Sequence, residues 1–274
     1  MPKTIFLLIL LLITACRQND SPSQLKFKAY ESNPILSPGA PGSWDDLTTG
    51  VPNIIWHDSV FYLFYMGRNV PGRIAIGLAT SYDGIHYQKF GGNPVLASDN
   101  NGFDAFTVGP GIVVKEDSLW AIYFNALETA GFSPGPSMGR ATAKLPAGPW
   151  TRSDTPVLTT GSKGEWDAGF VIPSSILALK EGGYIMYYSG GYDYITLKDF
   201  FIGMATSSDG INWKKYNDPI TNQHPYTESD PFAMSLGAEG CVENPSVLFL
   251  DTICYMYYDY SASGKIGLAT ARVH

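Results

Sequence analysis

The sequence predicts an all-β protein: a β-propeller of four blades, each made of four antiparallel strands. Three observations lead to this fold class. A module recurs along the chain, with one glycine in register at intervals of 62, 64 and 64 residues. Each copy reads as four consecutive strands, and no helical period intervenes. Units this small cannot bury their own faces, so they must stack against one another.

The best-formed copy runs from Trp166 to Pro219. Apolar runs at 172–179 and 184–189, separated by a Lys-Glu-Gly-Gly turn, predict a β-hairpin. Residues 201–206 predict a third strand. Residues 211–216, which follow an Asp-Gly turn, predict the fourth. This order of strands is the one expected of a propeller blade.

Two positions align all four copies. The third strands share a glycine, at Gly77, Gly139, Gly203 and Gly267. The first strands share a proline, at Pro52, Pro110, Pro173 and Pro245, and we call these four the register prolines. The last copy stops after its third strand, so residues 25–30 (LKFKAY) are expected to supply the missing outer strand. That closure would join the chain ends and remove the free sheet edges.

The N-terminus is expected to be a targeting segment. A short apolar run at 5–13 follows Lys3 and is typical of a secretory signal, because it is too short to span a bilayer. The run ends in Ile-Thr-Ala-Cys, which resembles the bacterial lipoprotein cleavage box. The resemblance implies removal of residues 1–15, lipidation of Cys16, a tether at 16–24 and the propeller at 25–274, with the protein lipid-anchored in the cell envelope, either periplasmic or on the outer-membrane surface. An ordinary signal peptide with a chance cysteine is the alternative.

Composition limits the partners. The net charge of −7 argues against nucleic acid or anionic lipid, which would be repelled, so a lipid anchor is the one membrane contact expected. Cys241 and Cys254 are expected to be buried thiols and not a disulfide. The histidines and cysteines have no ligand spacing, so we expect no metal and no cofactor. We expect a monomer.

Two turns, SYDGIHY (81–87) and SSDGINW (207–213), resemble the Asp-box of sialidases. In that motif the aspartate is structural. Asp83 and Asp209 are therefore expected to accept hydrogen bonds from the backbone of a tight turn, while Gly84 and Gly210 supply positive φ.

The chemistry is expected where the first strands begin, because equivalent strand ends converge on one funnel at the propeller axis. The positions six residues before the register prolines are all acidic: Asp46, Asp104, Asp167 and Glu239. Two carboxylates facing each other could serve as a general acid and a general base. The same regularity also predicts a structural role, since acid and base need different surroundings. Both interpretations remain open for this set.

Glu243 breaks the regular pattern. Two positions before their register prolines, the other repeats carry Gly50, Val108 and Val171. An ionisable group among apolar strand residues is costly unless it is paired or functional. Glu243 is therefore the sharper candidate for a functional carboxylate. The alternatives are a buried structural partner of Asn244 or of an arginine, and a solvated loop residue.

The WD…P start of the repeats, the aromatic arm YIMYYSGG and the ATSxDGxxW turns together resemble the five-bladed propeller superfamily of glycoside hydrolases, including families 43, 32 and 130. The resemblance implies five blades, whereas the repeats number four. It implies an extracytoplasmic glycoside hydrolase that takes an oligosaccharide as its partner. Glu243 would be the acid, Asp46 would activate water and Asp104 would tune the acid. A glycoside phosphorylase and a non-catalytic propeller that binds glycan or protein are the alternatives.

Candidate substrate contacts follow from the same picture. Aromatic residues could form a sugar platform, with Asp167 beside them, and each could equally be a core residue. They are Trp44, Phe106, Trp166, Phe170 and Tyr192. A phosphorylase would need a cationic cradle, for which Arg68, Arg73 and Arg140 are candidates. The alternative for these arginines is that they are solvated.

Overall fold

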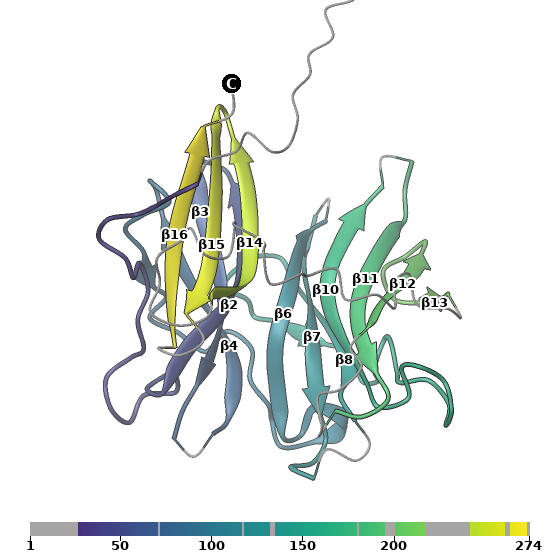
Figure 1. Ribbon diagram of the computed structural model, residues 1–274. Coiled ribbons are helices and arrows are strands. Elements are labelled where there is room, and N and C mark those ends of the chain that lie inside the picture. The colour runs from purple at the N-terminus through teal and green to yellow at the C-terminus, as the bar shows by residue number, and fades with distance from the viewer. Residues whose placement is uncertain are drawn as a thin grey trace, which may run out of the picture.

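The computed structural model describes residues 27–70, 72–116, 118–131, 135–179, 181–194, 201–216, 242–260 and 264–272. These residues form four antiparallel four-stranded sheets arranged as the blades of a propeller (Figure 1). The predicted fold class is confirmed, with four blades in the described part of the chain. The predicted signal segment, Cys16, Glu239 and Cys241 lie outside the described residues. No helix in the described ranges has the length and apolar character of a membrane span.

The blades follow the chain in order. Blade 1 contains β2 (Thr48–His57), β3 (Val60–Arg68), β4 (Ile74–Ser81) and β5 (Gln88–Lys89). Blade 2 contains β6 (Thr107–Lys115), β7 (Trp120–Leu127), β8 (Ser137–Ala143) and β9 (Thr151–Arg152), and a short 3-10 turn, η2 (Gly102–Asp104), precedes it. Blade 3 contains β10 (Phe170–Ala178), β11 (Tyr184–Gly191), β12 (Phe201–Ser207) and β13 (Lys214–Lys215). Blade 4 contains β14 (Val242–Leu250), β15 (Ile253–Tyr260), β16 (Lys265–Arg272) and β1 (Lys28–Ala29).

Blade 4 is completed by the N-terminal strand, as predicted. The N-terminal strand β1 pairs antiparallel with β16, with Lys28 opposite Thr270 and Ala29 opposite Ala269. The first and last strands of the described chain thus share one sheet. The paired segment is shorter than the predicted 25–30.

The outer strands are also shorter than predicted, two residues each. In blade 3 the reason is the Asp-box turn. Asp209 Oδ1 accepts the backbone N–H groups of Ile211 and Asn212, both at 2.8 Å. Residues that we expected in the strand therefore belong to the turn, and β13 begins only at Lys214.

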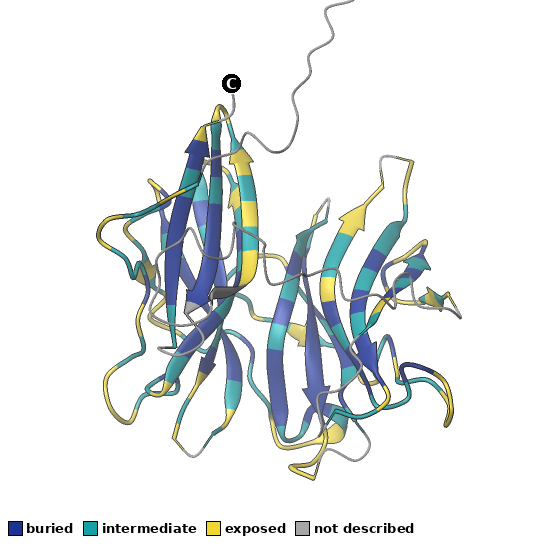
Figure 2. Cartoon of the chain, viewed as in Figure 1, coloured by how far each residue is buried: buried dark blue, intermediate teal, exposed yellow. Residues whose placement is uncertain are grey.

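Three core clusters join blades 4 and 1, blades 1 and 2, and blades 2 and 3. Among the described residues, no such cluster joins blades 3 and 4. Blade 2 has a neighbour on each face, and its second strand, β7, is buried at every position (Figure 2). By contrast, β14 and β10 show exposed positions along their length (Figure 2). The first strands of these two blades are therefore the least covered.

In blades 2 and 3, the glycine of the third strand is explained by an aromatic ring from the second strand. A Cβ on Gly139 would lie 2.3 Å from the Phe124 ring, and one on Gly203 would lie 2.4 Å from the Tyr188 ring. Both distances are well inside van der Waals contact. The repeat that reveals the fold is thus a packing requirement.

The Asp-box turns connect neighbouring blades. Tyr257 in blade 4 donates its hydroxyl to the carbonyl of Gly84 in blade 1, at 2.9 Å. Tyr123 in blade 2 donates in the same way to Gly210 in blade 3, at 2.9 Å. The structural role predicted for Asp83 and Asp209 is confirmed, because their carboxylates hold the turns that receive these bonds.

Cys254 is a free, buried thiol opposite Phe249 in the β14–β15 pair, as the sequence predicts. Burial raises the pKa of this thiol above its ordinary value.

Candidate active site

The four register prolines meet at the propeller axis, as predicted. They line a cavity of about 440 Å³ together with Val51, Gly111, Ile172, Ser174, Ser189 and Asn244. No charged residue belongs to this described lining. We call this space the axial cavity.

A second cavity of about 530 Å³ adjoins the first and shares Pro110 and Ile172 with it. It lies where β6 begins and β3 and β7 end, which is the strand end where the sequence places the chemistry. Its lining includes Arg68, Phe106, Thr107, Asn125 and Tyr194. We call it the upper cavity, and the two together form the funnel.

Arg68 is the one charged side chain in the described lining of the funnel. It forms no ion pair with any other described residue. The other two predicted arginines do not line the funnel. Arg140 is ion-paired with Glu116 at 2.8 Å, and Arg73 donates to Asn100 Oδ1 at 2.8 Å. The structure therefore separates the three members of the predicted cationic cradle.

Three aspartates at the blade entrances share one structural arrangement. Each is buried and forms an ion pair with a basic residue on the outer strand of its own blade. The pairs are Asp45 with Lys89 at 2.5 Å, Asp104 with Arg152 at 2.8 Å and Asp167 with Lys215 at 2.6 Å. These ion pairs favour the structural role, the second of the two interpretations left open for the recurring acids.

The count from the register proline selects the wrong residue in the first repeat. Asp45, not Asp46, is the equivalent of Asp104 and Asp167, because the first strand carries one additional residue before Pro52. Asp46 is half-buried in the loop before β2. Its carboxylate accepts the N–H groups of Gly42 at 2.7 Å and Val70 at 3.1 Å.

Two opposing influences act on the pKa of Asp104. Burial raises the pKa of this carboxyl above its ordinary value, and the neighbouring Arg152 opposes that shift without cancelling it. No described contact links Asp104 to the funnel lining.

The two predicted platform tryptophans pack against the sheets. Trp166 is 8% exposed and stacks on Tyr188, with ring centroids 5.6 Å apart. Trp44 lies against Tyr65 at the same centroid distance, 5.6 Å, and over Gly77. Neither tryptophan lines the funnel.

Sequence reasoning missed Asp259, a buried carboxylate at the blade 4 side of the axis. Its Oδ2 accepts the Val51 N–H at 3.2 Å and the Asn244 side-chain amide at 3.0 Å. Val51 and Asn244 directly precede register prolines and have positive φ, 46° and 51°. Val51 is β-branched and rarely adopts this conformation, whereas asparagine tolerates it, so one carboxylate supports a strained bulge at Val51 and a second bulge at Asn244.

Asp259 also lies beside the predicted acid. The β14–β15 register places the backbone of Glu243 directly opposite Asp259. The side chain of Glu243 lies outside the described part of the structure, so its predicted role stays a prediction.

A signal in the repeats could have found these residues. In each blade, an aromatic residue of the second strand lies opposite the shared glycine of the third strand. The residue that follows this aromatic differs between the blades: Met66, Asn125, Ser189 and Asp259. Met66 and Asn125 line the upper cavity and Ser189 lines the axial cavity. These positions lie at one level of the ring yet differ in chemistry from blade to blade.

Asn125 is an unusual member of this set. The residue is 5% exposed, and its Oδ1 has no hydrogen-bond partner among the described atoms. Its side chain hydrogen-bonds the Tyr194 hydroxyl. Burial raises the pKa of Tyr194, and this hydrogen bond partly offsets the effect. A buried acceptor without a partner calls for an explanation.

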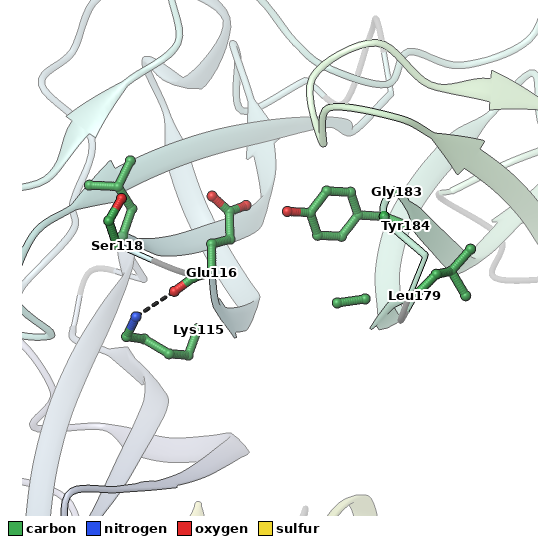
Figure 3. Close-up of a pocket in the computed structure, with 9 residues that line it drawn as sticks. Lys115, Glu116, Ser118, Leu179, Gly183 and Tyr184 are labelled. Atoms are coloured by element: carbon green, nitrogen blue, oxygen red, sulfur yellow. Dashed lines mark hydrogen bonds between the residues drawn. The ribbon is translucent and has the colours of Figure 1, made fainter.

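A third cavity of about 460 Å³ lies at the other end of the strands, between the hairpin turns of blades 2 and 3 (Figure 3). Lys115, Glu116, Leu179 and Tyr184 are in its lining, and the Tyr184 ring and the Glu116 carboxylate point toward each other across it (Figure 3). The described residues contain no cluster of acidic, histidine or cysteine side chains able to hold a metal ion.

Solved structures with a similar architecture are known. A protein described as a glycoside hydrolase superposes with a TM-score of 0.69 at 14% identity, covering 92% of this chain and 94% of that one. The chain shares its fold. BT0996, in a structure described as an RGII complex, gives a TM-score of 0.56 at 17% identity, over 86% of this chain and 74% of that one. The β-1,2-mannobiose phosphorylase of Listeria innocua, with bound β-1,2-mannobiose, gives 0.53 at 12% identity, over 91% and 97%.

Sequence comparison adds two relatives. The uncharacterised Mycobacterium tuberculosis proteins MT1551 and Rv1502 are each 25% identical, over 193 and 195 residues. The match covers 67% of this chain and 60% of each relative, so the chain spans less than two thirds of their length. No family model matches the chain.

Proposed function

We propose that this protein is a glycoside hydrolase that binds an oligosaccharide in the funnel and protonates the glycosidic oxygen with Glu243. The observation that supports the proposal most is the pairing of Glu243 with Asp259 in the β14–β15 register, next to the strained bulge at Val51 and a second bulge at Asn244. Strained backbone persists where the surroundings enforce it, and such places are often functional sites. The shared fold with proteins described as glycoside hydrolases is consistent with this activity.

The roles follow from the carboxylates available. Glu243 lies opposite Asp259 in the backbone register, and two carboxylates brought close together would disfavour simultaneous ionisation, so that one of them would keep its proton at higher pH. A protonated carboxyl is the group that a glycosidase uses to protonate the leaving oxygen. We assign that role to Glu243. Asp259, which accepts the Val51 N–H and the Asn244 amide, is the residue opposite it in the β14–β15 register.

The water-activating base in this proposal is Asp46. It lies in the loop before β2 and is bound to the N–H of Val70, two residues after Arg68 of the upper cavity. Its partial exposure allows water to reach it. Asp104 and Asp167 are given no catalytic step, because their ion pairs account for their burial. Export and lipidation at Cys16 complete the proposal and are supported by the Ile-Thr-Ala-Cys motif.

A non-catalytic glycan-binding propeller is the second candidate. The observation that favours it is that Asp45, Asp104 and Asp167, the acids recurring at the blade entrances, are all engaged in ion pairs. A propeller whose recurring acids are structural can bind a glycan in its funnel without turning it over.

The test compares hydrolysis of aryl-glycosides and oligosaccharides by the wild-type protein with that by Glu243→Gln, Asp259→Asn and Asp251→Asn. Asp251 lies in the exposed β14–β15 turn with φ of 53°, which asparagine tolerates, so this variant is the matched control. We expect Glu243→Gln to lower kcat at least about 100-fold without weakening substrate binding. Unchanged turnover in Glu243→Gln would remove the acid assignment. Glycan binding without turnover on any substrate would favour the second candidate.

A further inference from the structure

The upper cavity places one positive charge among neutral groups. Arg68, at the end of β3, forms no ion pair with the described residues and is the one charged residue of the described funnel lining. The protein as a whole carries a net charge of −7. The described lining of the funnel is therefore positive, although the protein as a whole is negative. A concave site concentrates the electric field of such a charge.

The surroundings leave the guanidinium available. The turn at Gly72 has no side chain, and a Cβ built there would lie 3.7 Å from Arg68 Nη2. The adjacent carboxylate, Asp46, is bound by the backbone N–H groups of Gly42 and Val70. The planar fork of an arginine matches the two oxygens of a carboxylate, and Arg68 is exposed, so that a ligand can reach it.

The remaining lining suits a hydroxylated ring. The buried Oδ1 of Asn125 has no partner among the described atoms, so a ligand hydroxyl, directly or through a water, would satisfy it. Phe106 and Tyr194 supply aromatic surface in the same lining. The volume of about 530 Å³ is within the usual range for small-ligand sites, about 300–1,000 Å³.

We propose that the funnel recognises an acidic sugar, a uronic acid residue whose carboxylate is bound by Arg68 and whose hydroxyls meet Asn125. The inference rests on the proposed function only in that the funnel binds glycans, and it does not require Glu243 to be the acid. The chemistry that carries it is one cation, one unpartnered buried acceptor and two aromatic rings in the described lining of one cavity. A sulfated sugar offers a similar negative charge with a different geometry.

The experiment is calorimetric titration of the Glu243→Gln protein with four trisaccharide probes. These are trigalacturonic acid, its methyl ester, neutral xylotriose and a sulfated trisaccharide. We expect trigalacturonic acid to bind at least about 10-fold more tightly than its ester, which keeps the ring and the length but loses the charge. In the Arg68→Gln background that preference should disappear, because affinity for the acid should fall to about that for the ester. The acid should also bind more weakly as salt rises.

Two further variants keep the test sharp. Arg272→Gln removes an exposed arginine at the end of β16 and should leave all affinities unchanged. Asn125→Asp keeps the side-chain shape but adds a negative charge, and it should abolish binding of the acid. Equal affinity for the acid and its ester, or an unaltered preference in Arg68→Gln, would overturn the proposal while leaving a neutral-sugar hydrolase intact. Tighter binding of the sulfated probe would overturn the carboxylate assignment. Absence of binding to every probe, combined with no turnover of any glycoside, would defeat the proposed function as well.

Discussion

Asp167 provides the clearest test of whether the recurring acids are structural or bind substrate. The sequence places it among the substrate contacts. In the structure it is 3% exposed, forms an ion pair with Lys215 at 2.6 Å and accepts the Tyr188 hydroxyl at 3.0 Å. Burial, followed by the charge of Asp167, raises the pKa of Tyr188 well above its usual range. We therefore expect Asp167→Asn to cost stability and to leave ligand affinity unchanged.

The magnitude follows from what the substitution leaves behind. Asparagine retains an acceptor for Tyr188 but removes the counter-charge of Lys215, whose side chain is 24% exposed. Removing one partner of a buried pair costs about 3–5 kcal/mol, and the partial exposure of Lys215 places the cost near the lower end, about 3 kcal/mol. For a domain of this size that is a fall in Tm of about 6–12 °C.

Differential scanning calorimetry measures the loss, and Asp46→Asn serves as the control. Asp46 is half-buried and contacts only backbone N–H groups among the described residues, so its replacement should cost about 1 kcal/mol or less. The double variant Asp167→Asn with Lys215→Met should recover part of the loss, because it removes both charges. A wild-type Tm in Asp167→Asn, together with weaker glycan binding, would refute the structural interpretation.

Two further predictions concern the repeat itself. Gly139→Ala should lower the free energy of unfolding by about 3 kcal/mol in urea denaturation, because the new methyl would sit 2.3 Å from the Phe124 ring; full stability would show that the sheet can shift to admit it. Backbone hydrogen bonds from Asn212 and Ile211 hold the pKa of Asp209 well below its ordinary value, so its stabilising effect is complete above about pH 4, the unfolded value, and is lost as the pH falls further. Asp209→Ala should therefore lower Tm at pH 7 and differ progressively less from wild type below about pH 4, whereas a constant difference across pH would contradict this assignment.

The architecture could be predicted because its requirements repeat. A glycine is needed where an aromatic ring of the second strand packs on the third strand, as at Gly139 and Gly203. Glycine therefore recurs in the sequence at a nearly fixed spacing. The closing strand could be placed for a related reason, since the last copy lacks a fourth strand and the N-terminal segment supplies one. Strand lengths were less predictable, because the Asp-box hydrogen bonds at Ile211 and Asn212 replace ladder bonds.

The candidate site was harder to predict because its contacts join residues far apart in the sequence. Nothing in the letters around Asp45 shows that Lys89 will neutralise it, so the neighbouring Asp46 looked equivalent to Asp104. Asp259 was missed for a different reason. Its importance lies in supporting two bulges on different blades, at Val51 and Asn244, and neither the bulge nor the support is visible in a linear pattern.

The wrong assignment of Asp46 and the omission of Asp259 have one physical origin, and it indicates which positions of a propeller sequence are candidates for function. A ring of similar blades requires the same packing residue at the same level in each blade, so regular positions report stability. Chemistry on an asymmetric sugar requires different groups at one level of the ring. The set Met66, Asn125, Ser189 and Asp259 has that property, since the four residues share a structural position and differ in polarity and charge. Packing alone does not explain two residues of this set. Asn125 has an acceptor without a described partner, and Asp259 lies opposite Glu243 in the strand register.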